Sequence, residues 1–256
     1  MRVEGRCVVV TGAASGIGAA LARRFAAEGA HLVLADVDEL ALQAVVEDVG
    51  GLGARCDVSR EEEVRALVDA AEARYGPVDL FCSNAGVLEI GGPEAPDRAW
   101  ERSLGVNLMG HVYAARVLVP RMLERGGGHL LQTASAAGLL TQIGSAPYSV
   151  SKHAAIAFAE WLAITYGDRG IKVSVLAPQA VRTAMTAGVE NGGVAGVDGM
   201  LEPDHVADAV IDGLAAETFL ILPHTEVLEY FRRKASDYDR WIAGMQRLQA
   251  RFGGML

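Results

Sequence analysis

The stretch Cys7–Gly18 reads CVVVTGAASGIG, an apolar run that passes abruptly into a turn containing three glycines. The apolar run is typical of a buried strand, and Ala19–Glu28 has the pattern of a helix. Glycines at such a strand-to-helix turn let the backbone approach a pyrophosphate, which the free N–H groups at the start of the helix can bind. This stretch therefore predicts a dinucleotide-binding turn.

A carboxylate follows at the position that a dinucleotide site requires. Asp36 lies 18 residues after Gly18 and directly follows the apolar run His31–Ala35. A carboxylate at the end of a second strand binds the ribose hydroxyls of the adenosine and would repel the extra phosphate of NADP. We therefore predict NAD as the cofactor. Ser15 and Arg55 are the side chains that could bind a phosphate in an unusual geometry.

Short apolar runs alternate with amphipathic helical segments along most of the chain. The predicted strands are Cys7–Val10, His31–Ala35, Gly53–Cys56, Val78–Cys82, Gly128–Thr133, Lys172–Ala177 and Thr218–Leu222. Several are apolar throughout, as expected when helices cover both faces of a parallel sheet. We predict a doubly wound α/β fold, Rossmann-like with about seven strands, and a single domain over residues 1–256.

The composition argues against several classes of partner. The 256 residues carry a formal charge of −9, so no cationic field is present to attract a nucleic acid or an anionic membrane. No run is long and apolar enough to span a bilayer. The three cysteines form no C-x-x-C pair and are interpreted as buried thiols, which predicts a cytoplasmic protein. The six histidines form no metal-binding pair, so no metal is predicted.

Two segments depart from the alternation. Residues 184–200 contain five glycines among small apolar residues, and we interpret this segment as a substrate lid made of a mobile loop or short helices. Residues 225–252 repeat apolar side chains near a heptad spacing, which predicts a helical extension with a break at Gly244. Because the pattern is short, packing on the domain or on a second subunit is favoured over a coiled coil or a membrane helix.

The glycine turn belongs to an ordered set of motifs. These are Thr11-Gly12-x-x-x-Gly16-x-Gly18, Asn84-Ala85-Gly86, Asn107, Ser135 and Tyr148-x-x-x-Lys152. Together they resemble the short-chain dehydrogenase/reductase family over about residues 5–225, in its branch of about 250 residues. The resemblance implies an oxidoreductase that interconverts a secondary alcohol and a ketone with NAD, and by analogy a homotetramer.

Tyr148 and Lys152 can be interpreted without the family. Pro147 begins a predicted helix, and a separation of four places both side chains on one face. An ammonium about 4 Å from a phenol contributes on the order of 4 kcal/mol at an effective dielectric near 20, which would lower the phenol pKa toward neutral pH. We therefore expect Tyr148 to act as general acid/base. Taken alone, the pair could also be an ordinary surface contact.

The resemblance implies roles for four residues. Tyr148 exchanges the proton, Lys152 holds the nicotinamide ribose, Ser135 donates to the substrate carbonyl, and Asn107 positions a water that relays protons to Lys152. Ser135 also follows a predicted strand, which places it at the carboxyl edge of the sheet. Outside the family context, Ser135 could be a strand-end cap and Asn107 a helix-interior polar residue that finds a partner.

The resemblance also transfers cofactor contacts position by position, to Gly12, Ser15, Gly16, Ile17, Gly18, Asp36, Asp57, Val58, Asn84, Ala85, Gly86, Tyr148, Lys152, Pro178, Val181 and Thr183. Asp57 has a second explanation, because Asp57-Val58-Ser59 with Glu62 three residues later is also a helix-capping pattern. Gln179 stands where the family usually has glycine. Its side chain narrows the space beside the nicotinamide and could touch the substrate.

The substrate is a small molecule of apolar character in this interpretation. A pocket could be lined by Leu88, Leu139, Leu140, Met185 and Met200, with Gln142 and Gln179 as polar contacts. Such a lining favours a hydrophobic or ring-bearing alcohol, although core packing explains the same residues equally well. The alternative function is a non-catalytic NAD-binding sensor or scaffold on the same fold, against which the intact Ser, Tyr, Lys and Asn set argues.

Overall fold

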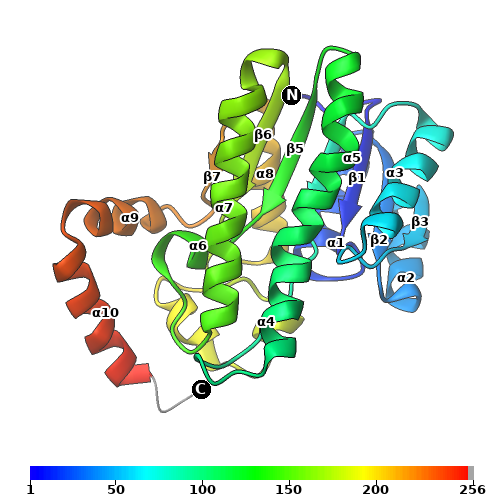
Figure 1. The fold of residues 1–256 in the computed structure, drawn as a ribbon. Coiled ribbons are helices and arrows are strands. Elements are labelled where there is room, and N and C mark those ends of the chain that lie inside the picture. Colours follow the sequence, from blue (N-terminus) through cyan, green and yellow to red (C-terminus); the bar gives the residue numbers. More distant parts are fainter. Residues whose placement is uncertain (253–256) are drawn as a thin grey trace.

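The computed structural model describes the backbone of residues 1–252 and the side chains of residues 1–189 and 191–252. The described chain contains a seven-stranded parallel sheet in the order β3-β2-β1-β4-β5-β6-β7 (Figure 1). The strands are β1 Cys7–Thr11, β2 His31–Asp36, β3 Leu52–Arg55, β4 Leu80–Ser83, β5 Gly128–Thr133, β6 Ile171–Leu176 and β7 Leu220–Ile221. The predicted fold class is therefore confirmed, and no strand end differs from its predicted position by more than two residues.

Helices cover both faces of the sheet (Figure 1). One layer contains α1 Gly16–Ala27, α2 Glu39–Val49 and α8 Pro203–Ala215, and the other contains α3 Glu61–Tyr75, α5 Gly110–Glu124 and α7 Ala146–Tyr166. The remaining helical elements are α4 Asp97–Leu104, η1 Gly105–Met109, α6 Ala137–Leu140, η2 Gly167–Arg169, η3 Ala184–Thr186, η4 Glu190–Gly196, α9 Glu226–Ser236 and α10 Tyr238–Phe252. No helix within residues 1–252 is long and apolar enough to cross a membrane.

The continuous apolar character of β1 follows from its place between two cores. Val8 and Val10 pack into the core beneath α1, whereas Cys7 and Val9 pack into the core on the opposite face. Successive side chains of a strand point to opposite faces, so a strand covered on both sides must be apolar at every position. All four side chains are buried accordingly.

The strand order reverses at β1, which has β2 on one side and β4 on the other. The turn that follows β1 needs glycine at two positions, Gly12 and Gly18. Gly12 has a φ of +65°, and a Cβ on Gly18 would lie 1.9 Å from the Gly12 carbonyl oxygen. The Asn84 side chain donates to the carbonyl oxygens of Thr11 (3.0 Å) and Gly12 (3.3 Å), which joins the turn to the end of β4. Open α/β sheets bind ligands at such a reversal.

The C-terminal extension is helical as predicted, but the break predicted at Gly244 is wrong. Gly244 lies inside α10, and the chain bends at Asp237 between α9 and α10. Asp237 has an extended backbone, and its carboxylate accepts the N–H of Arg240 at 2.9 Å. An aspartate in this conformation starts a new helix by capping its first turn, a stronger signal than the reduced helix propensity of one glycine.

The extension packs on the domain, as one of the predicted alternatives states. Val227 of α9 is fully buried in the core that also contains Leu139 and Leu140 of α6. The buried Lys234 ammonium donates to the Leu139 carbonyl oxygen at 2.6 Å, at the C-terminal end of α6. A lysine at a helix C-terminus satisfies an otherwise unpaired carbonyl group. Of the two predicted alternatives for residues 184–200, a mobile loop or short helices, the structure shows the short helices η3 and η4.

Candidate active site

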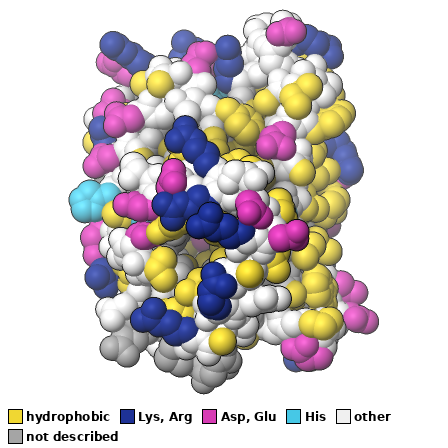
Figure 2. Space-filling model, turned by 90° about the vertical axis from the view of Figure 1, so that its left-hand side faces the viewer, with side chains coloured by type: hydrophobic (Ala, Val, Ile, Leu, Met, Phe, Trp, Pro, Cys, Tyr) yellow, Lys and Arg dark blue, Asp and Glu magenta, His cyan; other side chains and the backbone are white. Residues whose placement is uncertain are grey.

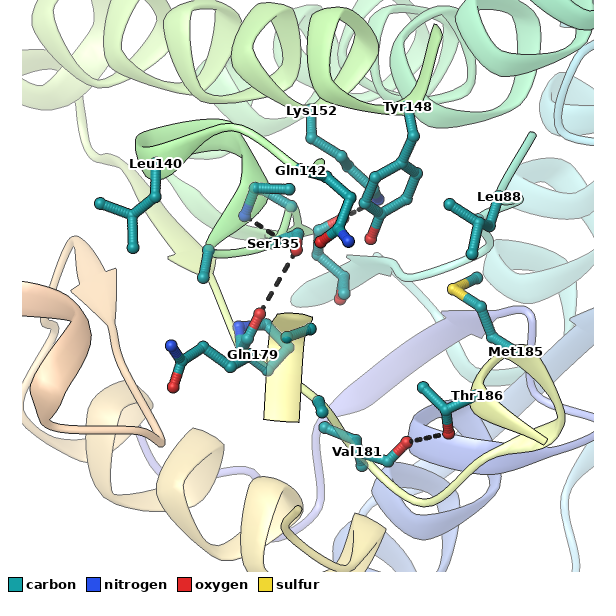
Figure 3. A pocket seen from close by; sticks show the side chains of 18 of the residues that line it. Leu88, Ser135, Leu140, Gln142, Tyr148, Lys152, Gln179, Val181, Met185 and Thr186 are labelled. Carbon is teal, nitrogen blue, oxygen red and sulfur yellow. Dashed lines mark hydrogen bonds between the residues drawn. The ribbon is translucent and has the colours of Figure 1, made fainter. Parts of the chain in front are cut away.

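A cleft of about 1500 Å³ opens at the carboxyl ends of β1, β4, β5 and β6. Every catalytic and cofactor-binding residue that the sequence analysis proposed lines this cleft except Asn107. The glycine turn and Asp36 form one end, whereas Tyr148, Gln179 and Met185 lie toward the lid. Figure 3 shows Tyr148, Lys152 and Ser135 on one wall and Gln179 and Met185 across from them. The fold thus brings together motifs that are far apart in the chain.

The start of α7 positions Tyr148. The Ser145 hydroxyl accepts the Tyr148 N–H at 3.3 Å, so a serine N-cap begins the helix at Ala146, with Pro147 in the first turn. Four residues later, Lys152 projects from the same face, and its ammonium nitrogen lies 5.7 Å from the centre of the Tyr148 ring. The ammonium donates to the carbonyl oxygen of Thr133, at the end of β5, at 2.9 Å. Both side chains are buried.

Burial controls the protonation of this pair. It raises the pKa of Tyr148, and the Ser135 hydroxyl offsets part of that rise by stabilising the phenolate. It also lowers the pKa of the Lys152 ammonium to about 7. The Tyr148 pKa therefore lies above its ordinary value, whereas the spacing to Lys152 predicted a pKa below it. Desolvation disfavours the phenolate, and the ammonium is directed to Thr133 and partly loses its charge near neutral pH.

Ser135 lies at the carboxyl end of the sheet, as its place after β5 predicts. Its hydroxyl accepts the N–H of Ala137 at 3.1 Å and donates weakly to the Pro178 carbonyl oxygen at 3.4 Å. The first contact is that of a strand-end cap, so the structural explanation of Ser135 holds. The hydroxyl nevertheless lines the cleft and affects Tyr148, so the capping contact leaves it accessible to a ligand oxygen.

Asn107 lies in η1, a π-helical segment between α4 and α5 that the sequence analysis does not predict. The side chain is fully buried: it donates to the Val87 carbonyl oxygen (2.9 Å) and to the Ser151 hydroxyl (3.0 Å), and it accepts the Val87 N–H (2.9 Å). A Cβ on Gly86 would lie 3.4 Å from both the Asn107 oxygen and the Lys152 ammonium. Gly86 therefore leaves the space between these two groups open.

Asp36 holds the turn at the other end of the cleft. One carboxylate oxygen accepts the N–H of Ala14 (3.0 Å) and the other accepts the N–H of Asp38 (3.1 Å). Arg55, the candidate phosphate ligand, instead pairs with Glu63 at 3.0 Å. The groups at this end therefore favour ribose hydroxyls over a further phosphate.

The capping explanation of Asp57 is wrong in its details. The residue that precedes α3 is Arg60, and it makes no side-chain cap, whereas the pattern predicts a cap at Ser59 with Glu62. The Asp57 carboxylate accepts the N–H and hydroxyl of Ser59 (3.0 and 2.7 Å), and Glu63 accepts the Asp57 N–H at 2.8 Å. A tight turn therefore precedes α3 and presents Asp57 to the cleft.

Residues 184–200, the segment predicted to be a lid, are joined to neighbouring elements by contacts that the sequence analysis missed. Gln179 donates through its side-chain amide to Asp198 at 3.1 Å, and the Tyr230 hydroxyl of α9 donates to the other oxygen of Asp198 at 2.8 Å. The Gln179 N–H also donates to His224 at 3.2 Å. Gln179 thus lines the cleft and also contacts the segment 184–200 through Asp198. A glycine at this position would lack the amide contact.

The apolar lining is partly as predicted. Leu88, Leu140 and Met185 line the cleft together with Gln142 and Gln179, whereas Leu139 and Met200 do not. Leu139 is instead buried in the core, and Met200 lies against Gly192. The missed contributors include Trp241, Met245 and Leu248 of α10. Their heptad-like spacing indicated a buried face, but not that the face borders the cleft.

Within the described residues, no group of three or more His, Cys, Asp or Glu side chains is arranged to hold a metal ion. Cys7, Cys56 and Cys82 are free and buried, and burial raises the pKa of Cys7 to about 11 and of Cys56 to about 12. These thiols are protonated at neutral pH and are poor nucleophiles. The reactive groups of the cleft are therefore Tyr148, Lys152 and Ser135.

The family model described as "short chain dehydrogenase" matches residues 6–192. The chain belongs to the short-chain dehydrogenase/reductase family. It is 38% identical to 1-deoxy-11-beta-hydroxypentalenate dehydrogenase of Streptomyces exfoliatus, over 95% of this chain and 92% of that protein. The predicted family and the predicted oxidoreductase class that acts on alcohol groups are therefore confirmed.

Two solved structures show the same architecture. A short-chain dehydrogenase/reductase from Burkholderia phymatum in complex with NAD has a TM-score of 0.86 and 33% identity, with 93% of this chain and 96% of that chain covered. A 7α-hydroxysteroid dehydrogenase in complex with NADH and 7-oxo glycochenodeoxycholic acid has a TM-score of 0.78 and 28% identity, with 86% and 93% covered.

Proposed function

We propose that this chain is an NAD-dependent oxidoreductase that interconverts a secondary alcohol and a ketone, with Tyr148 as the general acid/base. The observation that carries the proposal is the presence of Tyr148, Lys152 and Ser135 in the same cleft as the glycine turn and Asp36. A proton-transfer group and a dinucleotide site that share one cleft are the parts that hydride transfer requires.

The residues divide the chemistry among them. Bound NAD supplies the acceptor for the hydride. In the oxidation direction, Tyr148 takes the proton from the substrate hydroxyl while Ser135 holds the substrate oxygen by a hydrogen bond. Lys152, which lines the same cleft, is assigned the binding of the nicotinamide ribose. Asn107 is assigned the positioning of a water beside Lys152, through the space that Gly86 leaves open.

The preference for NAD is supported by the end of the cleft that contains Asp36. The carboxylate faces the place of the adenosine ribose, and the nearby Arg55 is held by Glu63. The solved relatives contain NAD and NADH, which agrees with this preference. The glycine turn, Asp57, Val58, Asn84 and the segment 178–183 line the path along which the cofactor would lie.

The substrate is proposed to be an apolar, bulky alcohol or ketone. Leu88, Leu140 and Met185 line the same cleft as Tyr148, and the cavity is large enough for a cofactor together with a multi-ring molecule. The names of a hydroxypentalenate dehydrogenase and a hydroxysteroid dehydrogenase among the relatives agree with this class. By family analogy, the proposal also includes a single catalytic domain, a homotetramer and a cytoplasmic location.

The test is NADH absorbance at 340 nm over a panel of bulky secondary alcohols and the matching ketones, with NAD and NADP supplied in parallel. Turnover with NAD that disappears in Tyr148→Phe supports the proposal. NAD binding with no turnover of any panel member would instead identify a sensor or scaffold. Equal or higher efficiency with NADP would contradict the assignment of the cofactor.

A further inference from the structure

The C-terminal helix α10 forms a wall of the cleft on its substrate side. It follows α9 at one side of the molecule (Figure 1) and packs against η4, within the segment 184–200. Trp241, Met245 and Leu248 lie at positions i, i+4 and i+7 of the helix and present one apolar face to the cleft. The same wall also contains charged residues, which an apolar alcohol alone would not require.

Four arginines line the cleft, and they differ in their partners. Arg102 pairs with Glu89, and Arg233 pairs with Glu229 at 2.9 Å. Arg240 and Arg247 form no ion pair with any carboxylate among the side chains of residues 1–189 and 191–252. Figure 2, which views the molecule from the α9–α10 side, shows basic side chains around a hollow with hydrophobic side chains inside it.

Arg240 and Arg247 lie along one edge of the apolar face of α10. Seven residues make two helical turns, so both side chains project from the same side of the helix, about 10 Å apart along its axis. Their long side chains can converge on a group between them. The apolar residues Trp241 and Met245 lie in the stretch between the two arginines. This wall therefore combines a hydrophobic surface with two available cations.

The aspartates in and beside the cleft bind other groups and form no ion pair with these two arginines. Asp36 and Asp57 lie at the cofactor end, where backbone N–H groups hold both carboxylates. Asp198 accepts from Gln179 and Tyr230, and Asp237 accepts the backbone N–H of Arg240 rather than its guanidinium. The chain as a whole carries a charge of −9, so an anion would be repelled unless local cations attract it.

We propose that the substrate carries a carboxylate that Arg240 and Arg247 bind, while its apolar body lies against Trp241, Met245 and Leu248. A planar guanidinium matches a carboxylate in geometry and binds it more strongly than a neutral oxygen. This inference rests on the proposed function and narrows its substrate class to apolar hydroxy acids or keto acids. The carboxylate is held away from Tyr148, so it orients the substrate for proton transfer.

The test compares the binding of lithocholate, a hydroxylated sterol acid, with that of its uncharged methyl ester by titration calorimetry in the presence of NAD. The full chain and Arg240→Gln, Arg247→Gln and the double variant are measured. The control is the double variant Arg232→Gln/Arg251→Gln, which removes the same charge from residues of α9 and α10 that do not line the cleft.

We expect the full chain to bind the acid about tenfold more tightly than the ester, and the double variant at Arg240 and Arg247 to lose this preference. Affinity for the ester stays within about twofold in every variant, and the control keeps the preference. Equal affinity of the full chain for the two probes, including no binding of either, would overturn the proposal. An equal loss in the control would also overturn it, because the effect would then be one of net charge.

Binding is measured separately from turnover, so the two proposals can fail independently. If the acid preference depends on Arg240 and Arg247 but no alcohol is oxidised, the anion site stands and the proposed function fails. If uncharged alcohols are oxidised and no acid preference is found, the proposed function stands and the carboxylate site fails. Circular dichroism and the melting temperature of each variant verify that the fold is retained.

Discussion

Lys152 and Tyr148 share one face of α7, with the Lys152 ammonium 5.7 Å from the centre of the phenol ring and 2.9 Å from the Thr133 carbonyl oxygen. Burial favours the neutral form of both side chains, since it raises the pKa of Tyr148 and lowers that of Lys152 to about 7. The phenolate must therefore be stabilised by other groups. Within the protein, Ser135 has that effect.

Replacement of Ser135 is expected to shift the pH profile of alcohol oxidation. The Ser135 hydroxyl lowers the Tyr148 pKa, so Ser135→Ala raises it and moves the ascending limb of kcat/KM toward higher pH. At neutral pH, oxidation slows by about tenfold or more. The measurement is kcat/KM against pH for both proteins. A slower variant with an unshifted limb would show that Ser135 acts only on the substrate.

Lys152 is expected to make stability depend on pH above neutrality. Between about pH 7 and about pH 10, the unfolded chain keeps the lysine protonated while the folded protein holds it neutral, so the unfolded state binds more protons. Stability therefore rises with pH in this window, by at most about 1.4 kcal/mol per pH unit, and this contribution is lost as pH falls toward 7. Urea unfolding of the wild type and of Lys152→Met at several pH values measures it. A constant difference between the two proteins would contradict the shift.

The local features of the site were predictable from sequence because neighbouring residues determine them. The turn at Gly12 and Gly18 depends on backbone conformation and close approach within one short segment. The strand Gly128–Thr133 is found with the predicted bounds because glycines precede it and its apolar run ends where Ser135 begins the next turn. The common face of Tyr148 and Lys152 follows from helical spacing alone.

Features that depend on burial and distant contacts were not predictable in this way. The direction of the Tyr148 pKa shift depends on the burial of the phenol in the folded protein, where Lys152 donates to the Thr133 carbonyl oxygen at the end of β5. The lid contact joins Asp198 to Gln179 and Tyr230, 19 and 32 residues away. No periodicity or spacing in the sequence indicates that these three residues are in contact. Asp237 did carry a local capping signal, which would have located the break.

A change at Asp36 is expected to alter the choice of cofactor. Asp36→Asn removes the negative charge but keeps an oxygen that can accept a turn N–H. NADP is then no longer repelled, and the ratio of kcat/KM for NAD over NADP falls by about tenfold. Steady-state kinetics with each cofactor measure the ratio. An unchanged ratio, with the fold intact, would show that another group selects NAD.

Loss of either contact to Asp198 is expected to loosen the lid. Gln179→Ala and Tyr230→Phe each remove one hydrogen bond, which stabilises by about 1 kcal/mol, and amide exchange over residues 184–200 then accelerates by about fivefold. Hydrogen exchange followed by mass spectrometry localises the effect. Tyr166→Phe, at the far end of α7, serves as the control. Unchanged exchange of residues 184–200 in both variants would mean that Asp198 does not hold the lid.

The most direct test of the catalytic assignment is the turnover rate of Tyr148→Phe in saturating NAD and alcohol. We expect kcat to fall by about 100-fold or more, because general acid–base catalysis contributes at least this factor, while NAD affinity and the melting temperature are retained. Tyr166→Phe, a change of the same kind outside the cleft on the same helix, keeps full activity. A Tyr148→Phe protein that is folded, binds NAD and turns over at the wild-type rate would contradict the mechanism.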